Sequence, residues 1–236
     1  MKIAITVAYN GTHFLGSQIQ KESTNTIFGE IQRVFNSIGV REQCIASGRT
    51  DKGVHATGQV FHIELPTYWN DLIKLKNVLN KMLPNSILIK NIKKVSDNFH
   101  ARYSAKKRVY RYIIKSSNSN PFEEQFISFI KDADFRIIKK NISLFIGEHD
   151  FKAFMRTGSD TKNSIRIIYN AFAYKHKEYL VLNFEANGFL RSQIRLMVGA
   201  LLCLDKEDII HKLNLTKEIS LKPAPPNGLY LAKIKY

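Results

Sequence analysis

Apolar and polar positions change period several times along residues 1–95, and each period predicts an element. Alternation at residues 2–9 is typical of a half-buried strand. Apolar residues at helical spacing behind a Thr/Asn start signal predict a helix within residues 24–39. The other elements expected here are strands at residues 44–47 and 57–65, a helix over 70–83 and a strand at 86–95. The second helix is expected to bury one side, formed by Leu72, Leu75, Leu79 and Met82.

The pattern restarts near residue 108 with a strand, which is followed by a polar connection. Alternating and apolar runs predict four more strands, two of which form a hairpin that turns at Lys175 to Lys177. An apolar run at 189–203 is expected to be a helix of the core, including Phe189 and Ile194. The remaining elements expected are strands at 108–115, 165–176 and 178–186, a helical stretch at 135–147 and a closing strand at 228–236.

Two segments of similar strand and helix content predict an α+β fold. We expect two similar α/β halves, residues 1–105 and 106–236, each an antiparallel sheet backed by helices. A basic cleft between the halves is the expected place for a site.

The charge of the chain points to a polyanionic partner. Its 236 residues contain 36 Lys+Arg against 20 Asp+Glu, a formal net charge of +16. Such an excess attracts RNA or DNA when it gathers on one face, although a lysine-rich solvated surface is the alternative. The segment at residues 90–94 is expected to be solvated charge, whereas Lys106, Lys107 and Arg108 are better placed for phosphate contact because they precede Tyr110.

Several other classes are disfavoured. Cys44 and Cys203 stand far apart without Cys/His neighbours, so neither a disulfide framework nor a zinc site is predicted. The first residues do not form a signal peptide, and no apolar run reaches the length of a membrane span. We therefore expect a cytoplasmic protein without a membrane partner.

The segment ASGRTDKGVHATGQV, residues 46–60, concentrates groups that could carry chemistry. Asp51 follows Arg49 and precedes Lys52, and the two cations favour an ionised carboxylate that could act as a nucleophile or stabilise a cationic sugar. Its three glycines are expected to allow backbone geometry and ligand approach that side chains would block. The alternative is a surface turn that Asp51 caps and Arg49 pairs with.

Histidines near these residues are weaker candidates. Asp51 and His55 lack the further ligands that a metal site needs, so no metal is expected. His55 and His100 are each expected to be hydrogen-bonded structural residues.

The segment SGRTDKGVHATGQV resembles the signature of the tRNA pseudouridine synthase A family. Five further blocks follow the family's order along nearly the whole chain: YNGTHFLGSQIQ, FHARYSAKKRVYRY, GEHDFKAF, NGFLRSQIRLMVG and APPNGLYL. The resemblance implies a pseudouridine synthase fold of two halves around a cleft, a homodimer and no cofactor. It implies an isomerase that converts uridine to pseudouridine at positions 38, 39 and 40 of the tRNA anticodon stem-loop.

The resemblance also implies roles for four residues. Asp51 matches the catalytic aspartate, Tyr110 the tyrosine that contacts the substrate, Arg49 the arginine of the GRTD motif, and Arg195 the arginine expected to pair with the catalytic acid. Two departures concern substrate preference more than chemistry: Ser17 stands where the family often has tryptophan, and Gln193-Ile194 replaces methionine-valine.

The chemistry that follows from these roles has open alternatives. Asp51 could attack C1′ of the ribose, remove the C2′ proton or add to C6 of the base, and the uridine would have to be flipped out of its stem. Arg49 is the candidate to fill the vacated space. Competing interpretations are a noncatalytic RNA-binding protein, a synthase for another tRNA position or another RNA, and a phosphate-handling hydrolase.

Overall fold

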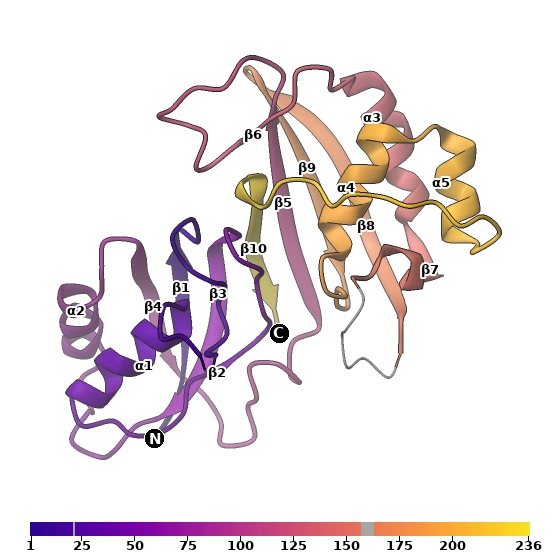
Figure 1. Cartoon of the computed structure of the whole chain (residues 1–236). Coiled ribbons are helices and arrows are strands. Elements are labelled where there is room, and N and C mark those ends of the chain that lie inside the picture. Colours follow the sequence, from indigo (N-terminus) through magenta and orange to yellow (C-terminus); the bar gives the residue numbers. More distant parts are fainter. Residues whose placement is uncertain (21, 157–162) are drawn as a thin grey trace. The chain divides into compact units, whose positions relative to one another are not determined.

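A computed structural model describes residues 1–20, 22–156 and 163–236 (Figure 1). The chain divides into two compact units, residues 1–106 with 231–236, and residues 107–230. Residues 231–236, which we expected in the second half, group with the first unit because strand β10 (Leu229–Lys235) extends its sheet beside β3.

The first unit is built on strands in the order β4-β1-β3-β10, with the short β2 also paired to β3. Strand β1 runs antiparallel to both β3 and β4, and its alternate residues are buried, as its pattern predicts. The bounds are Lys2–Tyr9 for β1, Ile45–Ala46 for β2, His55–Glu64 for β3 and Ile87–Lys94 for β4.

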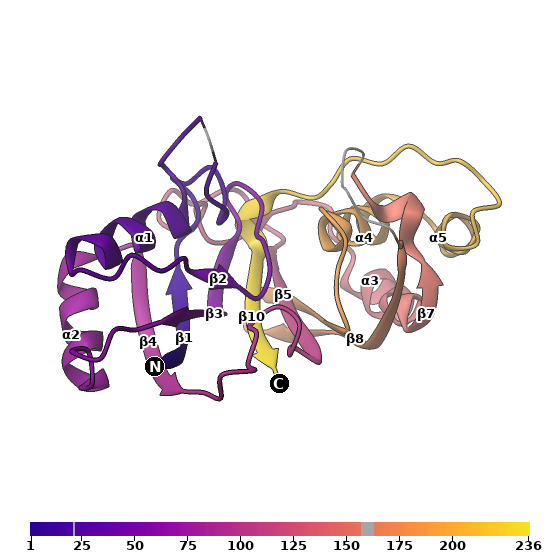
Figure 2. The same cartoon turned by 90° about the horizontal axis from the view of Figure 1, so that it is seen from below.

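Two helices pack on this sheet (Figure 2). Helix α1 (Ile27–Ser37) buries an apolar side against β3, and its Phe28 ring meets Phe61 edge-on at 5.4 Å between centroids. The side chain of Thr26 accepts a hydrogen bond from the Gly29 N–H and caps the helix start.

Helix α2 (Leu72–Met82) packs against β4, but its buried side differs from the expected one. Leu75 and Leu79 are buried, whereas Met82 is 41% exposed. Leu83, just past the helix end, is buried instead because it continues the four-residue spacing of Leu75 and Leu79.

The second unit has strands in the order β5-β9-β8-β7, with a short β6 paired parallel to β5. The neighbours β5-β9, β9-β8 and β8-β7 are antiparallel, which confirms the expected α+β class. The bounds are Lys107–Lys115 for β5, Ser128–Phe129 for β6, Gly147–Asp150 for β7, Ile165–His176 for β8 and Tyr179–Ala186 for β9.

The β8-β9 hairpin turn includes Lys177, as expected, but it begins two residues later than we expected and ends one residue later. Strand β8 continues through Lys175 to His176, which pairs with Tyr179. The turn therefore consists of Lys177 and Glu178, and Lys177 adopts a left-handed conformation with φ 54°.

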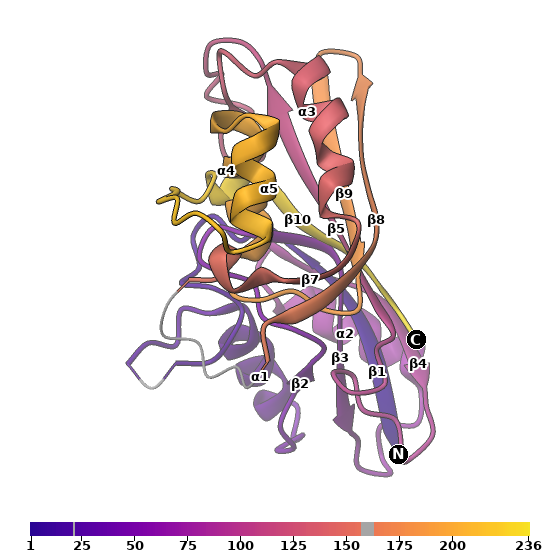
Figure 3. The same ribbon diagram turned by 90° about the vertical axis from the view of Figure 1, so that its right-hand side faces the viewer.

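Three helices lie together on one side of the second unit's sheet (Figure 3). They are α3 (Phe135–Asn141), α4 (Gln193–Cys203) and α5 (Lys206–Leu213). Short 3-10 turns span Ile142–Phe145, Phe151–Phe154 and Pro226–Gly228. Helix α4 is buried on most sides, including Ile194, but it begins at Gln193, so Phe189 lies before it rather than in it.

No helix in the described ranges combines the length and apolar character that crossing a membrane requires.

Candidate active site

Asp51 lies in the loop that joins β2 to β3 in the first unit. Its side chain is half-buried, and its backbone carbonyl accepts a hydrogen bond from the Val54 N–H at 3.1 Å. Gly53, with φ +78°, supplies the left-handed residue that this tight turn needs. The backbone on both sides of Asp51 is thus held in a defined turn.

Thr50, the residue before Asp51, is held by two residues of distant segments. Its N–H donates to Ser17 Oγ at 2.8 Å, and its carbonyl accepts from the Ser17 N–H at 3.1 Å. Its hydroxyl lies 2.9 Å from the hydroxyl of Tyr9. The sequence did not predict these contacts: Ser17 was noted only as a departure from the family that concerns substrate preference, whereas it contacts the neighbour of Asp51.

A second buried contact holds the start of the same loop. Ser47 Oγ donates to Gln59 Oε1 at 2.6 Å, and Gln59 Nε2 donates to the Gly48 carbonyl at 2.8 Å. Gln59 is fully buried. A polar residue at a buried strand position beside the motif was the available sequence signal for this contact.

The three glycines of the segment serve different purposes, and the two roles expected for all of them do not apply to each one. Gly53 supports the turn, and a Cβ on Gly48 would have no atom within 4 Å, so open space surrounds it. A Cβ on Gly58 would lie 2.3 Å from the carbonyl oxygen of Ala232. Gly58 therefore allows close packing of β3 on β10 rather than approach of a ligand.

The cations of the loop face outward. Arg49 and Lys52 are both exposed, on either side of the half-buried Asp51. An exposed guanidinium can contact a macromolecular ligand without the desolvation cost of a buried one.

Both histidines are hydrogen-bonded structural residues, as expected. His55 is buried, and its Nδ1 accepts a hydrogen bond from the Gly11 N–H at 3.1 Å. His100 Nδ1 accepts from the Arg102 N–H at 3.2 Å, and its ring stacks on Tyr103 at 4.3 Å between centroids. Among the described residues, no group of three or more His, Cys, Asp or Glu side chains could hold a metal ion.

Tyr110 and Tyr112 of β5 belong to the second unit and share its buried face, as their alternation predicts. Tyr110 is 8% exposed, and its ring meets Phe189 edge-on at 5.2 Å between centroids. Tyr112 is fully buried, and its hydroxyl lies 2.7 Å from Ser128 Oγ and donates to the Pro225 carbonyl at 2.8 Å. Burial raises the pKa of Tyr112 well above its usual range, against the hydrogen bond to Ser128, which lowers it.

Arg195 lies in the first turn of α4 in the same unit. Its Nε donates to the Ala224 carbonyl at 2.7 Å, and its own carbonyl accepts from the Ala224 N–H at 2.9 Å. Gln193 is fully buried, and its Oε1 accepts from the Leu190 N–H at 2.8 Å. This second departure from the family therefore fixes the turn from which α4, and with it Arg195, begins.

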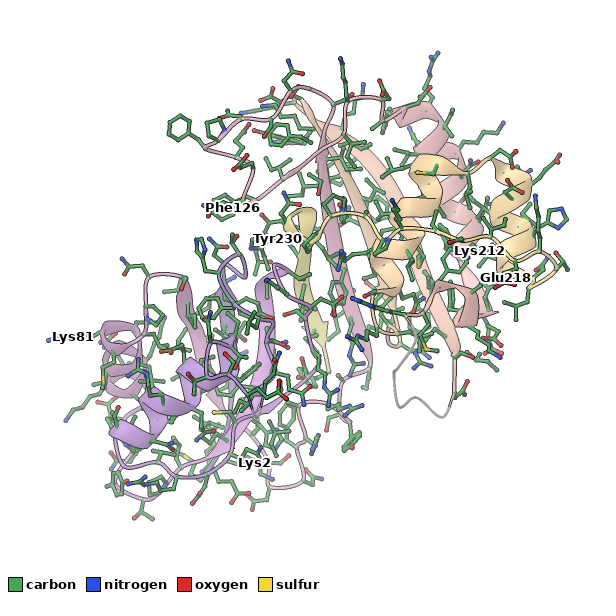
Figure 4. The ribbon with its side chains drawn as sticks, viewed as in Figure 1. Lys2, Lys81, Phe126, Lys212, Glu218 and Tyr230 are labelled. Carbon is green, nitrogen blue, oxygen red and sulfur yellow. The ribbon has the colours of Figure 1, made fainter. Side chains whose placement is uncertain are left out.

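Basic side chains outside the loop differ in their exposure and in the bonds that they make to other groups of the protein. Lys106 is exposed, but Lys107 forms an ion pair with Glu185 at 3.0 Å and Arg108 donates to the Asn187 carbonyl at 2.7 Å. Lys81, at the end of α2, points away from the ribbon, whereas Lys212 is 5% exposed and donates to a backbone carbonyl (Figure 4). The lysines at residues 90–94 are exposed, as expected for solvated charge.

The four predicted residues are thus divided between the two units, with two residues in each. The first unit holds Asp51 and Arg49 in one loop, and the second holds Tyr110 on β5 and Arg195 on α4.

Comparisons with known proteins agree with the resemblance seen in the sequence. A family model described as "tRNA pseudouridine synthase" matches residues 5–104 and 142–236. A tRNA pseudouridine synthase A of Campylobacter jejuni (strain RM1221) is 36% identical over 241 residues, covering both chains completely. A tRNA pseudouridine synthase A of Wolinella succinogenes and a tRNA pseudouridine synthase A 1 of Bacillus cereus are also 36% identical, over 97% and 100% of this chain and 92% and 98% of theirs.

Among solved structures, a chain from "Crystal Structure of a Cbf5-Nop10-Gar1 Complex" is 11% identical with a TM-score of 0.39. The match covers 97% of this chain and 48% of that chain.

Proposed function

Because the chain belongs to the tRNA pseudouridine synthase family, we propose that it isomerises uridine to pseudouridine at positions 38, 39 and 40 of the tRNA anticodon stem-loop, with Asp51 as the catalytic residue. The protein is an isomerase that acts on tRNA, as its family membership shows. The observation that carries the proposal is the loop at residues 47–60, which matches the family's signature and holds a half-buried Asp51 in a fixed turn.

The proposed reaction rearranges the substrate without exchanging atoms or electrons with a partner. The bond from ribose C1′ to base N1 breaks, the uracil turns and C1′ joins C5; C5 then loses its proton and N1 takes one up, so the composition of the nucleotide is unchanged. Asp51 would act on the detached or detaching sugar or on C6 of the base, and each of the three routes needs its carboxylate in contact with the nucleotide. Water must be excluded, because it would convert the isomerisation into hydrolysis.

The other three residues would bind the substrate and support the carboxylate. Tyr110 would contact the uracil, and a base–aromatic stack contributes about 1–3 kcal/mol. Arg195 would pair with Asp51, as the resemblance to the family implies. Arg49 is exposed and suits the space that a flipped uridine leaves in its stem.

The remaining parts of the proposal concern partners and place. Assembly as a homodimer, action without a cofactor or metal, and a cytoplasmic location stay predictions from the sequence. The net charge of +16 supports binding to the phosphate backbone of tRNA.

Asp51→Asn tests the proposed function. The enzyme would be assayed on anticodon stem-loop transcripts with uridine at position 38, 39 or 40, with RNA affinity measured in parallel. We expect the rate of isomerisation to fall by more than about a thousandfold, while affinity changes little. Asp97→Asn, a change of the same kind at an exposed residue, is the control and should retain wild-type activity.

The outcome separates the competing interpretations. Isomerisation that survives Asp51→Asn would exclude this carboxylate as the catalytic group. Mapping pseudouridine in cells with and without the protein tests the substrate, and a loss confined to ribosomal RNA would refute the anticodon stem-loop as its target.

A further inference from the structure

A buried cluster of hydroxyl and amide side chains lies directly beneath the proposed catalytic loop. Its members are Tyr9, Ser17, Ser47, Thr50 and Gln59, with exposed fractions of 4%, 1%, 1%, 7% and 0%. Buried polar groups are costly unless they are hydrogen-bonded, so a cluster of this size at one place calls for a reason.

Ser17 makes the closest approach of this cluster to Asp51. It exchanges two hydrogen bonds with Thr50, in which the Ser17 hydroxyl accepts from the Thr50 N–H and the Ser17 N–H donates to the Thr50 carbonyl. The carbonyl of Thr50 belongs to the peptide that leads into Asp51. Any shift of Ser17 is therefore transmitted to Asp51 through one peptide plane.

Ser17 and its neighbour Gly16 are themselves hydrogen-bonded to the start of α1. The carbonyls of Gly16 and Ser17 accept from the N–H groups of Ile27 and Phe28 at 3.2 and 3.0 Å. Gly16 has φ +113°, and a Cβ there would lie 3.0 Å from the Thr50 carbonyl oxygen. Residues 16–17 thus pack closely against Thr50, and their hydrogen bonds to the start of α1 hold them in place.

Tyr9, on strand β1 of the sheet, also contacts Thr50. Its hydroxyl lies 2.9 Å from Thr50 Oγ1, and β1, to which it belongs, is paired on both edges. Burial raises the pKa of Tyr9 to about 12, so its hydroxyl keeps its proton at neutral pH.

The nature of the side chain at position 17 is chemically specific. A side chain that lacks an oxygen or another acceptor atom could not accept the hydrogen bond from the Thr50 N–H. The acceptor that Thr50 N–H finds here exists only because residue 17 carries a hydroxyl oxygen.

We propose that Ser17 is a positioning residue for the isomerisation: its hydroxyl holds the Arg49–Thr50 peptide and its backbone N–H holds the Thr50–Asp51 peptide, and together they orient the Asp51 carboxylate toward the nucleotide. The inference rests on the proposed function, since it assumes that Asp51 is catalytic. Displacements below 1 Å at a reacting group are sufficient to slow a reaction greatly, so the loss of one such contact affects turnover more than binding.

Ser17→Ala tests the proposal by a split between kcat and KM. We expect kcat to fall roughly tenfold or more while KM stays within about twofold. Ser17→Thr retains the hydroxyl and should restore most of kcat, which a purely packing role would not predict. Ser37→Ala is the matched control, because its hydroxyl also bonds to a backbone group, the Val34 carbonyl at the far end of α1, and it should leave kcat unchanged.

A second variant keeps the proposal falsifiable if Ser17→Ala does not fold. Tyr9→Phe preserves the ring and removes only the hydroxyl that meets Thr50, so a fall in kcat of the same kind is expected. When both single variants fold, the double variant should lose less than the product of the single losses, because both act through Thr50.

The outcomes separate this inference from the function on which it rests. If Asp51→Asn is inactive but Ser17→Ala and Tyr9→Phe are folded and keep wild-type kcat, the positioning role is wrong and the proposed function stands. If Asp51→Asn retains isomerisation, the proposed function fails first. A kcat loss in Ser17→Ala that Ser17→Thr does not restore also overturns the role assigned to the hydroxyl.

Discussion

Arg195 and Ala224 hold each other by two hydrogen bonds, one from the Arg195 Nε to the Ala224 carbonyl and one from the Ala224 N–H to the Arg195 carbonyl. The first turn of α4 and the segment after α5 are therefore joined at a single residue. Tyr112 holds the next residue, Pro225, through its hydroxyl. A guanidinium anchored in this way has its direction fixed before any substrate binds, which suits the pairing role proposed for it.

Arg195→Lys should separate charge from geometry. Lysine keeps the positive charge but has no donor at the position of Nε, so the bond to Ala224 is lost. We expect the free energy of unfolding to fall by about 1–2 kcal/mol and kcat to fall with it. Urea denaturation and steady-state rates measure both effects.

The control for this change is Arg191→Lys, an exposed position just before the same helix. It should leave stability and kcat close to wild type. Wild-type stability in Arg195→Lys would contradict the anchoring role, and wild-type kcat would contradict the pairing role.

Gly48 and Gly58 allow a direct test of the different purposes of the motif's glycines. Gly58→Ala places a methyl 2.3 Å from the Ala232 carbonyl oxygen, and we expect a loss of about 1–3 kcal/mol in the free energy of unfolding. Gly48→Ala meets no atom within 4 Å and should change stability by less than about 0.5 kcal/mol. Equal losses in urea denaturation would show that the two positions do not differ in packing.

Local patterns predicted most elements of the fold. The alternation in β1 and in β5, with Tyr110 and Tyr112 on one face, is visible in the sequence because a strand's period depends only on its own backbone. The limits of the hairpin turn were less predictable, because Lys177 adopts a left-handed conformation without the Gly or Asn that normally signals one. The grouping of residues 231–236 with the first unit depends on pairing between strands far apart in sequence.

In the candidate site, too, local features could be predicted from the sequence and contacts between distant segments could not. Asp51 could be proposed from the sequence because its neighbours form a specific motif, which is local information. The contact between Ser17 and Thr50 joins residues 33 positions apart, and no periodicity predicts such a contact. Its only signal was negative: a residue type unusual for the family at a position next to a glycine.

Stability should decline with pH in the alkaline range. Burial raises the pKa of Tyr9 to about 12, whereas a tyrosine in an unfolded chain loses its proton near pH 10. Between these values the folded protein binds more protons than the unfolded chain, so the free energy of unfolding falls as pH rises, by about 1.4 kcal/mol per pH unit for this group. Burial raises the pKa of Tyr112 in the same direction and adds to the slope.

Tyr9→Phe should flatten this dependence. Urea denaturation of both proteins at several pH values from 8 to 12 measures the slopes. Below about pH 9 the two slopes should be equal, and above about pH 10 the variant's should be shallower by about 1.4 kcal/mol per pH unit. Parallel curves over the whole range would mean that Tyr9 is not the buried phenol described here.

Arg49 offers a test of how the uridine is extracted. If its exposed guanidinium fills the space left by the flipped base, it matters most where a base pair has to be opened. Arg49→Ala should therefore slow isomerisation of a paired uridine by roughly tenfold, and that of the same uridine opposite a mismatch much less, because the mismatch lowers the cost of flipping. Single-turnover rates on two stem-loops that differ only in the opposing base measure this ratio.

Lys52→Ala is the matched control, since it removes an exposed cation from the same loop without touching the GRTD motif. Its effect should be the same on the paired and the mismatched stem-loop, because a phosphate contact does not depend on the base opposite. An equal loss on both substrates in Arg49→Ala would reduce Arg49 to such a contact, and binding would then show a weaker dependence on salt, by roughly one unit in the slope of log affinity against log salt concentration.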